Sequence, residues 1–269
     1  MNAAFDLERV GGRRFLDALL SEVLAAGAEA LRLFSAGVAA RATKKPDRSP
    51  VTEADVAVER RLHDFLDRAC PDAAFLGEES APGEWSTTHA GLRFIVDPID
   101  GTRAFMRGLD SWGILIGLEA DGDPVLGIVS LPAREQLFVG LRGAGAYKNG
   151  APIRVSRVDS LADAAIAHGQ LAQFAEQGVL PLLPRLATDT YTQRGISDAY
   201  AHTLVLEGAL DAMVDPGVKP WDLCAVVPIL EEAGGRFTDF HGARTVHGGS
   251  GLASNGLIHD ELLELVRGA

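Results

Sequence analysis

Apolar residues recur at the spacing of an amphipathic helix in two stretches near the start of the chain. The first stretch runs from about Phe5 to Phe34, with apolar residues three or four positions apart. The second begins after Thr52, a favourable N-cap, and ends at Cys70, because Pro71 cannot continue a helix. The pattern therefore predicts two long helices joined by a polar segment that contains two prolines.

From Trp112 to Arg154 the pattern changes to that of β-strands. Two apolar runs flank Asp121-Gly122, a residue pair that favours a tight hairpin turn. We therefore expect an antiparallel meander, with strands at 94–96, 114–118, 125–129, 137–141 and 153–155.

The second half of the chain alternates between helical and strand patterns. The pattern predicts helices at 198–208, 222–233 and 259–266, and strands at 210–214, 236–239 and 252–253. Pro228 falls inside the middle helix, where we expect a kink. The change of pattern predicts two subdomains without a flexible linker, 1–155 and 156–269, and an α/β or α+β fold with sheets covered by helices.

Composition and charge exclude several classes of function. The chain has 269 residues, of which 47% are hydrophobic and 23% charged, as in ordinary globular proteins. Its formal net charge of −12 disfavours nucleic acid and anionic membranes as partners. The two cysteines, Cys70 and Cys224, form no C-x-x-C motif, so we expect two buried free thiols. With no signal-peptide pattern and no membrane-spanning apolar run, the sequence predicts a cytoplasmic protein.

The segment with the most chemical information places two carboxylates three residues apart. Asp97 and Asp100 follow a short apolar run, and Gly101 permits the unusual backbone of a sharp turn. Such a turn can direct both carboxylates to one point, expose the Ile99 carbonyl and start a helix at Thr102. Oxygen ligands suit Mg²⁺, and a helix N-terminus suits a phosphate group. Taken alone, the segment is equally compatible with a polar Asp-Gly turn.

Three other acidic residues have both a structural and a catalytic interpretation. Glu78 follows an apolar run and is either a metal ligand at a strand end or a solvated surface charge. Asp222 starts a helical segment and suits an N-cap. Asp55 completes a capping box with Thr52, or it orients a nucleophilic water together with Thr102. The two roles require the Asp55 carboxylate to bind different groups, so that one role could exclude the other.

Four segments in the same order resemble the inositol monophosphatase family, whose members are Mg²⁺-dependent, lithium-sensitive phosphatases. These are Ser-Pro-Val-Thr-Glu-Ala-Asp at 49–55, Gly-Glu-Glu at 77–79, Asp-Pro-Ile-Asp-Gly-Thr at 97–102, and Trp-Asp at 221–222 followed by Glu-Ala-Gly-Gly at 232–235. Each segment alone is only weak evidence for the family. All four in the same order are specific to it, and this favours the catalytic interpretations of the acidic residues. The resemblance implies a layered α-β-α-β-α sandwich of the inositol monophosphatase and fructose-1,6-bisphosphatase type.

The resemblance also implies a site for two or three Mg²⁺ ions. The implied ligands of one ion are Glu78, Asp97 and the Ile99 carbonyl, and those of a second are Asp97, Asp100 and Asp222. The N-terminal subdomain thus carries most of the ligands and the C-terminal subdomain carries Asp222.

Several implied roles concern the phosphate and the attacking water. A third, weaker ion near Glu78 activates water with help from Asp55 and Thr102, and the backbone at Gly101 and Thr102 holds the phosphate. Lys44 or Lys45 corresponds to a lysine that borders the site, and we prefer Lys45 from its sequence context. No covalent intermediate is required. The chain has no G-x-S-x-G motif, and we expect its scattered histidines to be surface or helix residues: His63, His89, His202 and His259.

The C-terminal half carries the information on the substrate. Segments 194–200, 211–216 and 247–250 look most like the histidinol-phosphate phosphatases of this family, which act in histidine biosynthesis. Asp198 and Asp215 suit the ammonium group of histidinol phosphate, and Arg194 belongs to the same candidate subsite. Asp215 suits the vicinal diol of inositol equally well, and Asp198 suits a helix N-cap. Inositol 1-phosphate, or a broad range of sugar and polyol phosphates, is therefore the alternative.

The remaining alternatives are disfavoured by composition. A 3′-nucleotidase needs cations and an aromatic surface, whereas aromatic residues are only 6% of this chain. A catalytically silent regulatory or binding protein is expected to have lost metal carboxylates, yet all four are present. The predicted partner is a small phosphorylated metabolite, and the resemblance implies a homodimer.

Overall fold

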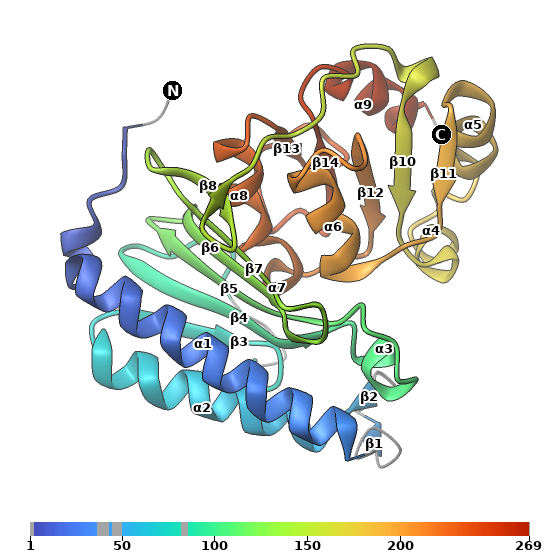
Figure 1. Ribbon diagram of the computed structural model, residues 1–269. Coiled ribbons are helices and arrows are strands. Elements are labelled where there is room, and N and C mark those ends of the chain that lie inside the picture. The colour runs from blue at the N-terminus through green and yellow to red at the C-terminus, as the bar shows by residue number, and fades with distance from the viewer. Residues whose placement is uncertain (1–2, 37–42, 45–49, 82–85, 269) are drawn as a thin grey trace.

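Two β-sheets with helices between and around them form the protein (Figure 1). The computed structural model describes residues 3–36, 43–44, 50–81 and 86–268. None of the helices in these ranges combines the length and the apolar character needed to cross a membrane. Lys45 lies outside the described residues.

The larger sheet has seven strands in sequential order, and only its first pair is parallel. Its strands are β3 (Ala74–Gly77), β4 (Leu92–Asp100), β5 (Gly113–Ala120), β6 (Asp123–Leu131), β7 (Gln136–Leu141), β8 (Gly145–Lys148) and β9 (Ala151–Pro152). The expected hairpin is confirmed: Asp121 and Gly122 join β5 to β6 with φ angles of 55° and 82°, as a tight primed turn requires. The strand predicted at 153–155 is wrong, because pairing ends at Pro152.

The smaller sheet has five strands, in the order β11-β10-β12-β14-β13. Their bounds are β10 (Ala165–His168), β11 (Thr192–Arg194), β12 (Ala212–Pro216), β13 (Arg236–Thr238) and β14 (Ser250–Ser254). The helices around it are α4 (Leu171–Glu176), α5 (Leu182–Asp189), α6 (Asp198–Leu206) and α9 (His259–Arg267). A separate two-stranded pair, β1 (Thr43–Lys44) and β2 (Pro50–Val51), precedes the second helix.

Alternating side chains along the strands define the layers. In β5, Ile114 and Ile116 pack with the two N-terminal helices, whereas Leu115 packs on the opposite face with residues of α6 and α8 (Val226–Glu232). In the smaller sheet, Met213 faces this middle layer and Val214 faces α5 and α9. The resulting order is helix, sheet, helix, sheet, helix, which confirms the expected five-layer fold and is visible in Figure 1.

The two N-terminal helices cover the outer face of the larger sheet. α1 (Gly12–Ser35) begins later than the predicted Phe5, because Gly11 has a φ of 94° and separates it from a short 3₁₀ turn, Leu7–Val10. α2 (Glu53–Ala69) begins after the expected N-cap Thr52.

A row of glycines lets the middle helices approach the larger sheet. Gly117, Gly127 and Gly140 are cross-strand partners on β5, β6 and β7. A Cβ atom at Gly127 would lie 1.9 Å from the Ala225 carbonyl oxygen, and one at Gly140 would lie 2.5 Å from Ile229 Cα. Any side chain in this row would therefore push the middle layer away from the sheet.

The single helix predicted at 222–233 is two helices, α7 (Pro220–Leu223) and α8. The break lies at Cys224 and Ala225, directly above the glycine row, and Pro228 falls in the first turn of α8. A proline is tolerated there because first-turn N–H groups have no helical acceptor. The break thus replaces the expected kink.

A buried ion cluster joins the second half of the chain to the larger sheet. Glu119 Oε2 in β5 accepts hydrogen bonds from Arg93 Nη2 at 2.6 Å and Nε at 3.0 Å, and Glu119 Oε1 lies 2.8 Å from His247 Nε2. His247 belongs to the loop between β13 and β14. We call Arg93, Glu119 and His247 the inter-sheet ion cluster.

The expected boundary near residue 155 falls between the two sheets in the chain. However, α7 and α8 come from the second half and pack on the larger sheet, so residues from both halves share one core. The division into residues 1–155 and 156–269 therefore stays a proposal.

Candidate active site

An irregularity in β4 directs two carboxylates to the same place. Asp97 pairs with Leu115 and Asp100 with Gly113, so β4 contains one residue more than its partner over this interval. Side chains three positions apart point to opposite faces of a regular strand, and a bulge re-aims one of them. Gly101 follows with a φ of 83°, and α3 (Thr102–Met106) starts immediately after it.

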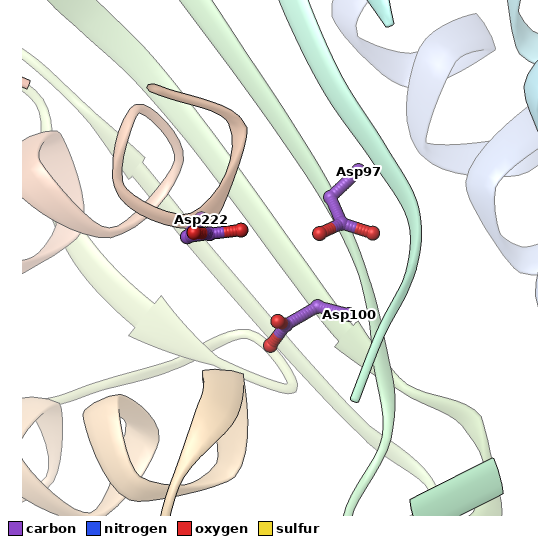
Figure 2. Close-up of side chains that lie close together, drawn as sticks. All are labelled: Asp97, Asp100 and Asp222. Atoms are coloured by element: carbon purple, nitrogen blue, oxygen red, sulfur yellow. The ribbon is translucent and has the colours of Figure 1, made fainter. Parts of the chain in front are cut away.

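Asp97, Asp100 and Asp222 converge at this point, with a ligand oxygen of each within 4.8 Å of the others. Figure 2 shows their carboxylates turned toward one another, two from β4 and one from α7. Asp97 is 2% exposed and Asp100 is 7% exposed. We call these three residues the acidic cluster.

Backbone N–H groups hold one oxygen of each carboxylate. Ile99 N donates to Asp97 Oδ1 at 3.0 Å, and Lys219 N donates to Asp222 Oδ2 at 2.7 Å. Asp100 Oδ2 accepts a hydrogen bond from the backbone N–H of Ala199. The side chains are thus fixed in position by neutral donors, none of which supplies a positive charge.

Burial and mutual repulsion raise the pKa of all three carboxyl groups. For Asp97 and Asp100, removal from water is the largest cause, followed by the nearby charges of Glu78 and Asp198, respectively. The pKa of Asp222 is raised in the same way. Three converging carboxylates are hard oxygen donors that suit Mg²⁺, and a divalent cation would relieve their repulsion. The residues present therefore fit the implied metal.

Glu78 lies beside the acidic cluster, directly after β3. Its backbone N–H donates to Val96 O at 3.1 Å, and its charge helps raise the pKa of Asp97, Asp222 and Asp55, after burial in each case. Glu78 is therefore close to the cluster, and its role as a metal ligand stays a prediction.

Glu59 supports the segment that carries Glu78, and the sequence analysis missed it. This α2 residue is 5% exposed, and its Oε2 accepts a hydrogen bond from Glu79 N at 2.7 Å. A Cβ atom at Gly77 would lie 2.4 Å from the same carboxylate. The only sequence signal is its position one helical turn after Asp55, on the buried face of α2.

The two proposed roles of Asp55 are compatible, because each uses a different oxygen. Asp55 Oδ2 accepts a hydrogen bond from Thr52 N at 2.8 Å and another from the Thr52 hydroxyl, which completes the capping box. Asp55 Oδ1 lies 3.2 Å from Thr102 Oγ1, which is also 3.1 Å from Ile99 O. One carboxylate therefore caps α2 and contacts the hydroxyl beside the acidic cluster.

Asp198 and Asp215 lie on the side of the cluster formed by the smaller sheet. Asp198 begins α6 with a φ of 63°, a backbone conformation that is uncommon for non-glycine residues. Burial and then the charge of Asp215 raise its pKa to about 6. Both residues also help raise the pKa of Asp100, so all three carboxylates are neighbours.

The other predicted residues have different surroundings. Arg194 is exposed and donates to Thr192 Oγ1 at 2.7 Å and Gln193 O at 2.9 Å, so its substrate role has no support and stays a prediction. The backbone of Gly101 and Thr102 forms the turn into α3, beside the acidic cluster. His202 and His259, expected as surface or helix residues, are helical but buried, at 2% and 0% exposed.

Known proteins are similar to this chain over most of its length. A model described as the inositol monophosphatase family matches residues 13–269. A histidinol-phosphatase from Mycobacterium tuberculosis is 40% identical, covering 92% of this chain and 96% of that protein. A histidinol-phosphatase from Streptomyces coelicolor is 36% identical, with 93% and 96% covered. An inositol-1-monophosphatase from Synechocystis is 32% identical, with 92% and 87% covered.

Solved structures share the fold over nearly the whole chain. The extragenic suppressor protein suhB from Bartonella henselae superimposes with a TM-score of 0.84 at 28% sequence identity, covering 94% of this chain and 98% of that one. The similarity therefore includes both sheets and the residues between them.

Proposed function

Because this chain belongs to the inositol monophosphatase family and is a phosphoric monoester hydrolase, we propose that it hydrolyses histidinol phosphate to histidinol and phosphate. The observation that carries the choice of substrate is the pair of neighbouring carboxylates beside the acidic cluster, the half-buried Asp198 and the buried Asp215. Its support from relatives is the 40% identity to a histidinol-phosphatase.

The acidic residues are the proposed ligands of two or three Mg²⁺ ions. Asp97 contributes to two of them, one with Glu78 and the Ile99 carbonyl and the other with Asp100 and Asp222. When bound, the ions activate water and neutralise charge on the phosphate oxygens. The backbone N–H donors at Ile99, Ala199 and Lys219 keep the carboxylates oriented before a cation arrives.

Asp55 and Thr102 orient the attacking water. With the Thr102 hydroxyl proton directed to Asp55 Oδ1, a lone pair on Thr102 Oγ1 accepts a hydrogen bond from the water. Burial raises the pKa of Asp55 above that of an ordinary carboxyl group, which favours its acting as a proton acceptor. The N–H groups of Gly101 and Thr102, at the start of α3, face no earlier helical turn and are the proposed donors to the phosphate.

The amine of histidinol phosphate matches the charge of the second carboxylate pair. An ammonium group between Asp198 and Asp215 forms charge-assisted hydrogen bonds and offsets the repulsion that raises the pKa of Asp198. A neutral polyol can accept and donate hydrogen bonds there but cannot relieve that repulsion. Inositol 1-phosphate, favoured by the 32% identity to an inositol-1-monophosphatase, is therefore the second candidate.

The test is phosphate release with Mg²⁺ from histidinol phosphate, inositol 1-phosphate, fructose 1,6-bisphosphate and 3′-phosphoadenosine 5′-phosphate. We expect kcat/KM for histidinol phosphate to exceed the others by at least about 100-fold, which is about 2.7 kcal/mol of transition-state discrimination. EDTA should abolish activity and millimolar Li⁺ should inhibit it. Equal rates across the panel would instead identify a broad sugar and polyol phosphatase.

A further inference from the structure

His202 in α6 is a buried histidine whose hydrogen-bonding capacity is unused. Its side chain is 2% exposed, and neither Nδ1 nor Nε2 has a hydrogen-bond partner in the described part of the chain. A buried polar group without a partner is destabilising. His259 is equally buried, yet its two nitrogens lie 2.8 Å from Ser254 Oγ and 3.1 Å from Thr238 Oγ1. Stability therefore does not explain why a histidine occupies position 202.

The neighbour of His202 is the carboxylate of Asp215. His202 Nε2 lies 3.7 Å from Asp215 Oδ2, which is within ion-pair range but longer than a hydrogen bond. On the other side, a Cβ atom at Gly169 would lie 2.2 Å from Asp215 Oδ1. The carboxylate is thus confined between the backbone of Gly169 and the imidazole ring of His202.

We propose that His202 is a positioning residue that holds Asp215 in place for an ammonium group of the substrate, an inference that rests on the proposed function. His202 carries its proton on Nε2 and, when the substrate binds, donates a hydrogen bond from this N–H to Asp215 Oδ2, while Asp215 Oδ1 accepts a hydrogen bond from the ammonium. Contacts of this kind are often long in the free enzyme and shorten in the complex with substrate. The 3.7 Å contact between His202 and Asp215 is a long contact of this kind.

An imidazole is suited to this task because it can orient a carboxylate without neutralising it. A lysine or arginine at the same position would form a full ion pair with Asp215 and compete with the ammonium of the substrate. A neutral histidine donates one hydrogen bond and leaves the negative charge available. Selectivity for amine-bearing esters therefore depends on His202, although His202 touches neither the phosphate nor the amine.

The experiment compares His202→Phe and His202→Gln with the wild type, and uses His259→Phe as the matched buried control. For each variant, kcat and KM are measured with Mg²⁺ on histidinol phosphate and inositol 1-phosphate, together with Tm. We expect His202→Phe to reduce the selectivity ratio about tenfold, mainly through KM for histidinol phosphate. His202→Gln should retain most of the ratio, because its amide can donate to Asp215.

The stability readout separates this role from a structural one. His202→Phe removes two unpartnered nitrogens, so its Tm should stay the same or rise. His259→Phe breaks two hydrogen bonds, so its Tm should fall while its selectivity ratio stays unchanged. An unchanged ratio in His202→Phe, with the wild type still preferring histidinol phosphate, would overturn the inference and leave the proposed function standing.

Nitrogen-15 NMR of the His202 ring gives a readout that does not depend on turnover. With histidinol bound, Nε2 should be the protonated nitrogen, and its proton resonance should shift in Asp215→Asn. An unprotonated Nε2 overturns the inference. A wild type that shows no preference for histidinol phosphate defeats the proposed function instead, as the substrate panel would reveal.

Discussion

Strand β4 contributes to two buried groups of charges that differ in how their charge is compensated. Near its start, Arg93 joins Glu119 and His247 in the inter-sheet ion cluster; four residues later, Asp97 belongs to the acidic cluster. Both groups combine residues of the larger sheet with a residue from the second half of the chain. Only the first contains an opposite charge for its carboxylate.

The difference is visible in the direction of the pKa shifts. Burial alone raises the pKa of Glu119, but hydrogen bonds from His247 and Arg93 outweigh it and hold the pKa below its usual value. In the acidic cluster, burial and the charges of the neighbouring carboxylates all raise the pKa of Asp97, which lies well above its usual value. The lowered pKa means that folding favours the ionised form of Glu119, whereas the buried carboxylates of the acidic cluster are destabilising in their ionised form until a cation binds.

Removing a charge from the acidic cluster should have the largest effect on activity. We expect Asp97→Asn to lower kcat at least about 10⁴-fold, or about 5.4 kcal/mol, because Asp97 is the proposed ligand of two ions. In EDTA its free energy of unfolding should equal or exceed that of the wild type, because one repelling charge is gone. Phosphate-release kinetics and urea denaturation measure both quantities. Activity within tenfold of the wild type would contradict the metal assignment.

Removing the carboxylate of the inter-sheet ion cluster should have the opposite consequence. Glu119→Gln leaves Arg93 buried, at 5% exposed, without its counter-charge, and we expect the free energy of unfolding to fall by about 4 kcal/mol. At a temperature where the variant is folded, kcat on the preferred substrate should stay within about twofold of the wild type. A large loss of kcat without a loss of stability would mean that the two groups are coupled.

The acidic cluster could be predicted from the sequence, whereas its surroundings could not. Asp97 and Asp100 stand in one short segment whose chemistry is local, and the Asp121-Gly122 hairpin is equally local. Asp222, whose own segment predicts an N-cap, was assigned as a ligand only through the family resemblance. The break between α7 and α8 depends on Gly117, Gly127 and Gly140 lying side by side, which requires the register of three strands.

The residues that position others were also beyond sequence reasoning. Glu59 and His202 lie on helices without any motif, and their importance follows only from a contact across the fold. The short elements β10, β11, α4 and α5 were missed because few residues carry each pattern. The order of short segments along the chain therefore indicates candidate ligands, and tertiary structure reveals what holds them.

His259 offers a third kind of burial, in which hydrogen bonds to hydroxyl groups satisfy a titratable side chain and the opposite charge of Asp260 only partly offsets the effect of removal from water. Burial, with a smaller effect of Arg236, lowers its pKa from 6.5 to about 4. As the pH falls below 6.5, the His259 imidazole becomes protonated in the unfolded chain. In the folded protein the same imidazole stays neutral until about pH 4. The contribution of neutral His259 to the free energy of unfolding is therefore fully present above pH 6.5. It declines as the pH falls, by about 3 kcal/mol in total.

This contribution can be isolated by comparing the wild type with His259→Gln in urea denaturation between pH 7 and pH 4. Carboxylates titrate alike in both proteins, so the difference in unfolding free energy reports His259 alone. We expect the wild type to lose its advantage over His259→Gln as the pH falls. A difference that stays constant with pH would mean that the buried imidazole accepts its proton as readily as an exposed one, and that burial does not by itself suppress ionisation in this fold.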